Sequence, residues 1–220
     1  EVALRGDVAL PATSAERRPV EVELEDVDLD GPPDWSIPYR PARLRSYGAD
    51  MTDSRQASKL RDSILAVVDG EGPISEDLCS ARVRASWLHA RNSSRVREAF
   101  ENGVRALELR GELFRTSDDF LYRDAEQLRQ VRHAMDWDPD SIRKAKDVAQ
   151  GELALALRRV LEDSGSATED ELSFRVARLF GWGRRGNDIA VALARALRHL
   201  AESDDVSRLA DGRYTVSKKN

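Results

Sequence analysis

The sequence predicts a mainly α-helical protein with small β-hairpins, an α+β fold in which one small domain occurs twice. The stretch 60–122 matches the stretch 153–215 without a gap when the chain is shifted by 93 positions (157 − 64 = 93). The aligned apolar pairs include Ile64 and Leu157, Val68 and Leu161, Val83 and Val176, Val96 and Ile189, Phe100 and Leu193, Val104 and Leu197, and Leu121 and Tyr214. Chance does not keep apolar on apolar so consistently, which indicates an internal repeat.

Composition places the chain among globular proteins, with 220 residues of which 40% are hydrophobic and 34% charged. No apolar run reaches the roughly 18 residues of a membrane span, and no secretion leader is visible. The single cysteine, Cys79, cannot form an internal disulfide. We therefore expect a cytoplasmic protein with no membrane partner. The chain starts at Glu1 instead of a methionine, which suggests a fragment or a processed chain.

The net charge of −5 comes entirely from the beginning of the chain. Residues 1–50 carry 11 acidic and 6 basic side chains, so the remaining residues are balanced (6 − 11 = −5). Because the repeats have no overall positive field, only a local basic patch could bind nucleic acid.

Residues 1–55 are predicted to be a linker with an acidic N-terminal segment, because the few apolar residues follow no regular spacing and prolines interrupt the stretch. Within it, residues 20–25 alternate apolar and charged side chains, the pattern of a half-buried strand. Trp35, Ile37 and Tyr39 are expected to attach the linker to the first copy of the repeat.

Residues 56–123 are predicted to contain three helices and a hairpin. Apolar side chains recur at helical spacing over residues 60–68, and a glycine-proline turn ends that helix. Ser75 is a natural N-cap for the second helix, and an apolar stripe over residues 96–107 marks the third. Two short strands around a polar turn follow, over residues 112–123.

The second copy, residues 151–220, repeats this order, and Thr168 with Glu171 forms a capping box at its second helix. Three helices followed by a hairpin is the order of a winged helix-turn-helix domain. Residues 124–150 are expected to form a helical connector. The predicted architecture is therefore a pair of tandem winged helix-turn-helix domains joined by that connector.

Several segments resemble a known family. They are Trp35-Ser36-Ile37-Pro38-Tyr39, Glu71-Gly72-Pro73-Ile74-Ser75, Arg82-Val83, Arg91 to Val96, Phe120-Leu121-Tyr122 and Gly181-Trp182-Gly183-Arg184-Arg185-Gly186. They resemble the uncharacterised C-terminal domain of large bacterial superfamily I helicase-like proteins. The resemblance implies a domain of unknown function associated with a nucleic-acid motor, and it carries over no catalytic residue. The phosphate-binding loop of such a motor, Gly-x-x-x-x-Gly-Lys-Ser/Thr, does not occur in this chain.

No catalytic or metal-binding constellation is recognisable in the sequence. His89, His133 and His199 lie far apart in the predicted elements and form no ligand set with Cys79. Cys79 aligns with Leu172 under the repeat, which predicts a buried and inert thiol. We therefore expect no enzyme activity, cofactor or metal in this chain.

The candidate functional residues are polar side chains in the turn before each third helix and on each hairpin. They are Arg91, Arg95, Arg115, Arg184, Arg185, Asn187 and Arg208. A helix-turn-helix brings this end of the fold to nucleic acid, where arginines and backbone N–H groups contact phosphates. DNA or RNA is thus the first expected partner. For Arg82 and Arg175, which neighbour a core valine, we expect ion pairs inside each domain.

The outward face of the third helix differs in composition between the two copies. In the first copy it carries Ser94, Glu98, Glu101 and Arg105, and the two carboxylates would repel phosphate. In the second copy it carries Asn187, Val191, Ala194 and Arg198, a small and partly apolar face. That face also suits a protein, so the alternative function is a structural or protein-interaction module that docks other domains of a helicase-like parent chain.

Overall fold

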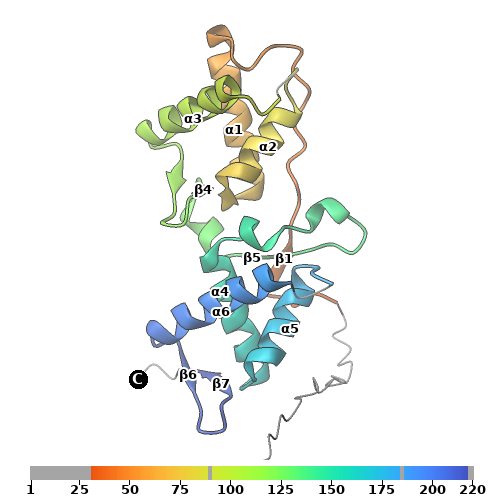
Figure 1. Ribbon diagram of the computed structural model, residues 1–220, viewed down its shortest axis with the longest axis vertical. Helices are drawn as coiled ribbons and strands as arrows, with labels where there is room; N and C mark the ends of the chain where they lie inside the picture. Colours follow the sequence, from red (N-terminus) through yellow and green to blue (C-terminus); the bar gives the residue numbers. More distant parts are fainter. Residues whose placement is uncertain (1–30, 89–90, 184–185, 218–220) are drawn as a thin grey trace, which may run out of the picture. The chain divides into compact units, whose positions relative to one another are not determined.

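The computed structural model describes residues 31–88, 91–183 and 186–217 (Figure 1). The fold is mainly α-helical with small β elements, as predicted. The predicted strand at residues 20–25 and the acidic N-terminal segment up to Asp30 lie outside the described residues. None of the helices in the described ranges combines the length and the apolar content that a membrane span requires.

The first copy consists of three helices and a small antiparallel sheet. The elements are α1 (Ala57–Glu71), β2 (Ile74–Ser75), α2 (Glu76–Ala85), α3 (Ser94–Leu109), β3 (Phe114–Arg115) and β4 (Phe120–Tyr122). The strand order is β2-β4-β3, so the hairpin pairs with the residues that precede α2. Side-chain oxygens of Ser75 and Ser93 accept from backbone N–H groups in the first turns of α2 and α3, which fixes where both helices begin.

The second copy repeats these elements at the predicted offset, except that an isolated bridge at Ala167 stands in place of β2. Its elements are α4 (Gln150–Ser164), α5 (Glu169–Leu179), α6 (Asn187–Glu202), β6 (Val206–Arg208) and β7 (Tyr214–Val216). The strand pairing follows the same shift: Ile74 pairs with Leu121 in the first copy, and Ala167 pairs with Tyr214 in the second. Thr168 and Glu171 form the predicted capping box at α5.

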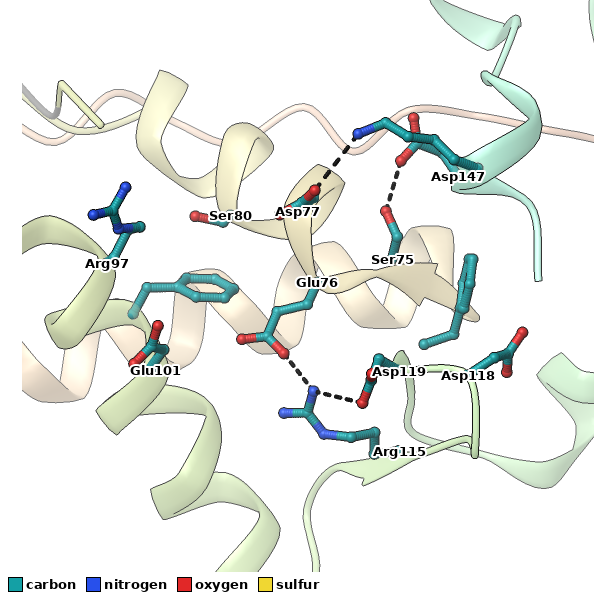
Figure 2. Close-up of a pocket in the computed structure, with 13 residues that line it drawn as sticks. Ser75, Glu76, Asp77, Ser80, Arg97, Glu101, Arg115, Asp118, Asp119 and Asp147 are labelled. Carbon is teal, nitrogen blue, oxygen red and sulfur yellow. Dashed lines mark hydrogen bonds and ion pairs between the residues drawn. The ribbon is translucent and has the colours of Figure 1, made fainter. Parts of the chain in front are cut away.

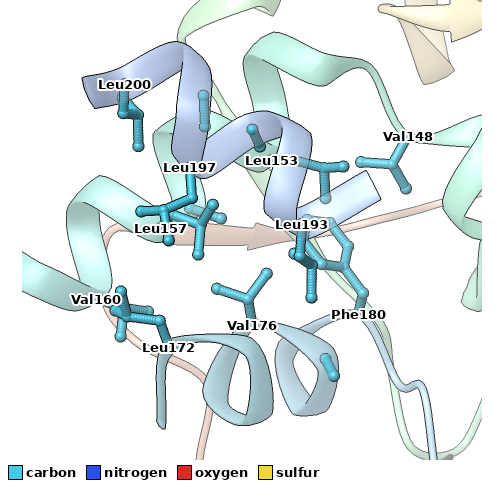
Figure 3. Packing of buried hydrophobic residues seen from close by; sticks show 14 of the residues in the cluster. Val148, Leu153, Leu157, Val160, Leu172, Val176, Phe180, Leu193, Leu197 and Leu200 are labelled. Carbon is cyan, nitrogen blue, oxygen red and sulfur yellow. The ribbon is translucent and has the colours of Figure 1, made fainter. Parts of the chain in front are cut away.

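Each copy has its own apolar core. In the second copy, Leu157 from α4, Val176 from α5 and Leu193 from α6 converge on one centre (Figure 3). The matching first-copy core contains Ile64 and Phe100. Burial of these stripes is the main source of stability, at about 25 cal/mol per Å² of apolar surface removed from water.

The segment before the first copy is attached to both copies. Strand β1 (Ser36–Pro38) pairs in parallel with β5 (Val131–His133) of the connector. Tyr39 is buried and donates its hydroxyl hydrogen to Glu71 of α1, as expected for an attachment to the first copy. Trp35 corrects that expectation, because its indole N–H donates to Asp163 of α4 at 2.7 Å and its ring packs on the second core.

The predicted helical connector is wrong in detail. Residues 124–150 contain β5 and only short 3-10 turns: η2 (Ala125–Arg129), η3 (Pro139–Ser141) and η4 (Ala145–Asp147). An additional 3-10 turn, η1 (Ser54–Gln56), precedes α1. The physical reason is tertiary: the chain is drawn out into β5 by pairing with β1, and Asp124 and Asp138 cap turns too short to propagate.

Cys79 should react with a thiol reagent only when the protein opens. The residue is fully buried in the first core, and burial raises the pKa of its thiol, as do the nearby carboxylates of Glu71 and Glu76. Because only the thiolate reacts, modification of the native protein should be at least about a thousandfold slower than in denaturant, the factor set by a typical stability. A timed reaction monitored by mass spectrometry would measure this, and rapid labelling of the native protein would contradict it.

Candidate nucleic-acid interface

Two of the predicted contact residues in the first copy lie on the surface. Arg91 is exposed in the loop before α3, and Arg95 is exposed in the first turn of that helix. Farther along α3, Glu98 and Glu101 are exposed as well, so the predicted acidic character of this face is present in the structure. Carboxylates at this position oppose the approach of a phosphate backbone.

Arg115, the hairpin arginine of the first copy, is held by carboxylates of its own domain. Its guanidinium donates to Glu76 of α2 and, at 3.0 Å, to Glu108 of α3, and lies 3.7 Å from Asp119. Partial burial alone would lower the pKa of Arg115, but these two hydrogen bonds outweigh it and raise the pKa. The charge of Arg115 is therefore balanced inside the domain.

An acidic pocket of about 400 Å³ surrounds Arg115, between α2, α3, the hairpin and η4 (Figure 2). Its carboxyl groups come from Glu76, Asp77, Glu101, Asp118, Asp119 and Asp147, and its cations are Arg97, Arg115 and Lys146. Figure 2 shows Arg115 directed at Glu76 and Asp119, and Ser75 at Asp147. The pocket could not be recognised in the sequence, because it combines segments that are far apart in the chain.

The hairpin of the first copy also supports the second copy. Asp118 in its turn accepts a hydrogen bond from the backbone N–H of Gln150, the first residue of α4, at 3.0 Å. A carboxylate at a helix N-terminus satisfies an unpaired donor and complements the helix dipole. This turn is therefore used for contact within the chain.

Arg208, which matches Arg115 under the repeat, has a different environment. It is exposed on β6, and no carboxylate in the described part of the chain lies within ion-pair distance of it. Its closest contacts are the carbonyl oxygen of Gly212 at 3.5 Å and the ring of Tyr214, whose centroid lies 5.8 Å from the guanidinium carbon. The guanidinium thus remains open to an anion from solvent.

The N-terminus of α6 is the other predicted contact region of the second copy. Asn187 is its exposed first residue, and the N-cap, Gly186, provides no side-chain acceptor, in contrast to Ser93 at α3. Asp188 is the one acidic side chain in this first turn, and the outward residues Val191 and Arg198 follow along the helix. The predicted contacts Arg184 and Arg185 lie outside the described residues.

Arg82 and Arg175 lie inside their copies, as expected, but only one of them forms the expected ion pair. Arg82 lies 3.4 Å from the buried carboxylate of Glu71. Arg175 instead donates to the hydroxyl of Ser164 at 2.5 Å. The repeat places a serine in α4 where α1 ends in Glu71, so the second copy lacks the matching carboxylate.

A buried ionic network joins the connector to both copies. The Glu152 carboxylate accepts from Arg132 at 2.6 Å and from Arg143 at 2.7 Å, and all three side chains are buried. Burial alone would raise the pKa of Glu152, but Arg143 and Arg132 outweigh it and hold that pKa at about 2. Arg132 also donates to the carbonyl oxygens of Glu71, Gly72 and Pro73. Sequence reasoning missed this network, since an arginine in a polar connector normally faces solvent.

One protein family is similar to part of the chain. The sequence model of the family described as "Protein of unknown function (DUF3320)" matches residues 50–98, which include α1, α2 and the first turn of α3. No curated protein matches the chain. The family match covers the part of the first copy that contains the Glu71–Ser75 and Arg82-Val83 segments, and it adds no reaction or ligand.

Proposed function

We propose that this chain is a non-catalytic accessory module of a helicase-like protein and that its second copy contacts DNA or RNA. The contacts would come from the turn before α6 and from the β6–β7 hairpin. The observation that carries the proposal is the difference between two matched arginines. Arg115 is paired with Glu76 and Glu108, whereas Arg208 is exposed without a carboxylate partner in the described residues.

The order of elements supports this proposal. In a winged helix-turn-helix domain the third helix and the hairpin face the same nucleic acid, and each copy here has three helices followed by a hairpin. On α6 no acidic side chain occurs between Asp188 and Glu202, so the outward surface around Arg195 and Arg198 would not repel phosphate.

The first copy would have a supporting role. Its third helix exposes Glu98 and Glu101, its hairpin arginine is paired, and Asp118 in its hairpin caps α4. In this proposal the first copy stabilises the folded chain, and the second copy binds the nucleic acid.

Protein docking within a helicase-like parent chain is the second candidate function. The favouring observation is the exposure of large apolar side chains: Leu109 at the end of α3 is 83% exposed, and Val191 on α6 is 59% exposed. Val191 lies on the same outward face of α6 as Arg198. Nucleic-acid contact predicts that arginine substitutions weaken DNA or RNA binding, whereas protein docking predicts that they leave it unchanged.

Arg208→Ala and Arg115→Ala form a matched test of nucleic-acid contact. Removing one arginine–phosphate interaction should reduce the slope of log affinity against log salt by about 0.9 on duplex DNA. We expect this reduction for Arg208→Ala and no change in slope for Arg115→Ala, which should instead lower stability. A labelled duplex and a labelled single strand should be titrated at several salt concentrations.

The sequence also allows a stronger version of this test. Arg184→Ala combined with Arg185→Ala should weaken binding uniformly across sequences, because phosphate contacts carry no base information. If neither strand form binds at low salt, or if Arg115→Ala reduces the slope as much as Arg208→Ala, the docking function should replace the present proposal.

A further inference from the structure

The loop between β5 and η3 carries a tryptophan that the folded chain leaves uncovered. Trp137 is 76% exposed, although tryptophan is among the residues that bury the most apolar surface when they are covered. The two residues on either side are Asp136 and Asp138, and Pro139 and Asp140 follow. This segment, Asp136–Asp140, is called the tryptophan turn below. Figure 1 shows it in the loop that leaves β5 and returns through η3.

Hydrogen bonds order the backbone of the tryptophan turn. Met135 and Asp138 close it by a backbone hydrogen bond of 3.0 Å. The hydroxyl of Ser141, which is 1% exposed, accepts from the N–H of Met135 at 2.7 Å and donates to the carbonyl oxygen of Asp138 at 2.6 Å. The side chain of Asp138 accepts from the N–H of Asp140. An ordered turn of this kind presents its side chain to a partner with little further loss of conformational entropy.

The turn is also strongly negative. It contains three aspartates and no basic residue, and the carboxylates of Asp136 and Asp140 are exposed. The nearest histidine, His133, is buried, and burial lowers its pKa, so it adds no positive charge near neutral pH. Arg143 is buried against the carboxylate of Glu152. The nearest arginine contact is that of Arg82 with the carbonyl oxygen of Asp140, at 3.5 Å.

We propose that the tryptophan turn is a docking site for an arginine- or lysine-rich segment of a partner protein. A guanidinium or ammonium group can lie over the indole face of Trp137 while Asp136 or Asp140 accepts its hydrogen bonds. Tryptophan is one of the residues enriched among those that dominate protein interfaces. Nucleic acid does not fit this site, because three carboxylates repel phosphates.

This site is independent of the nucleic-acid contacts proposed for the second copy. Those contacts require basic residues on the turn before α6 and on the β6–β7 hairpin, whereas this site requires an aromatic ring between carboxylates. Trp137→Ala should therefore leave the DNA titration unchanged, and Arg208→Ala should leave binding at the tryptophan turn unchanged. Each proposal can fail without the other.

A peptide titration followed by NMR tests the site. The probe is a synthetic peptide of alternating arginine and glycine, and the comparison peptide carries glutamate in place of arginine. The indole N–H signal of Trp137, assigned from its disappearance in Trp137→Phe, should shift on addition of the arginine peptide alone. The indoles of Trp35 and Trp182, which donate to Asp163 and to the carbonyl oxygen of Arg143, report whether the fold stays intact.

Three variants decide the outcome. Trp137→Ala should weaken peptide binding about tenfold or more, as truncation of an interface anchor does. Asp136→Asn with Asp140→Asn should weaken it at low salt and have less effect at high salt. Phe174→Ala, at an exposed aromatic residue on α5, is the matched control and should leave peptide binding unchanged. The proposal is overturned if Trp137→Ala binds the peptide like the unmodified chain, if the peptide shifts only residues of the acidic pocket, or if the turn instead mediates association of two copies of this chain.

Discussion

Glu152→Ala is expected to lower the free energy of unfolding by about 3–5 kcal/mol, because it leaves two buried arginines without their counter-charge. Glu152 accepts from both Arg132 and Arg143, and all three side chains are at most 4% exposed. The remaining hydrogen bonds of the two arginines to carbonyl oxygens cannot replace a full negative charge. Urea denaturation followed by circular dichroism at neutral pH would measure the decrease.

The same helix offers a control for this substitution. Glu162, also on α4, pairs with Arg158 at 3.0 Å and Arg159 at 2.9 Å, but at the surface. Glu162→Ala removes the same side chain and the same number of arginine partners, and should cost less than about 1 kcal/mol because solvent screens exposed pairs. Equal decreases for the two variants would mean that the buried network contributes no more to the free energy of unfolding than the exposed ion pairs do.

The pH dependence of this effect has a definite sign. The pKa of Glu152 is lowered from 4.5 to about 2 in the folded protein, so the unfolded chain takes up a proton first as the pH falls. The stabilisation is fully present above about pH 4.5 and is lost between that pH and about 2. Unmodified protein should therefore lose stability through this window more steeply than Glu152→Ala.

Gly181→Ala should destabilise the protein by about 2–4 kcal/mol, through backbone strain and a steric clash. Gly181 has a φ of +73°, in the left-handed region that a side chain disfavours. A Cβ atom added there would lie 2.8 Å from Cβ of Ala134 and 3.1 Å from Cγ1 of Ile142. The first of these is an atom directly bonded to the backbone, so the connector itself would have to move away from the end of α5.

Gly183 provides the comparison for this second substitution. It lies two residues farther along the same turn, and an added Cβ would meet nothing within 4 Å. Gly183→Ala should change stability by no more than about 0.5 kcal/mol, as most surface substitutions do. The thermal midpoints of both variants can be compared with that of the unmodified chain. A small decrease for Gly181→Ala, or a large one for Gly183→Ala, would show that close approach to Ala134 does not constrain this turn.

Much of the fold could be predicted because helices and hairpins are local. Apolar residues at a period near 3.6 mark one face of a helix, so the stripe from Val96 to Leu107 identified α3 without knowledge of its partners. The shift that aligns Leu121 with Tyr214 also placed the strand residues that pair in the second copy. Such patterns depend only on which face of an element is buried.

The connector and the charged contacts could not be predicted in this way. Arg132 and His133 are polar, yet both are buried because β5 pairs with β1, nearly one hundred residues earlier in the sequence. Charge alone does not tell a buried ion pair from a solvated side chain.

For the candidate interface, sequence matching treated Arg115 and Arg208 as equivalent. The carboxylates that distinguish them come from different elements, Glu76 on α2 and Glu108 on α3. Such a difference depends on tertiary distances, which one residue's position in a repeat does not contain.

The buried network also constrains how the two copies can be spaced along the chain. A tether that merely joins two domains tolerates insertions, since lengthening a flexible loop costs little free energy. Here Arg132 is hydrogen-bonded to carbonyl oxygens of the first copy at one end and to Glu152 in α4 at the other. A residue inserted between Arg132 and Glu152 would have to bulge out of a segment that this network holds at both ends and, through Arg143, in the middle. The length of this segment is therefore a structural requirement, and the copies behave as parts of one fitted assembly rather than as exchangeable modules.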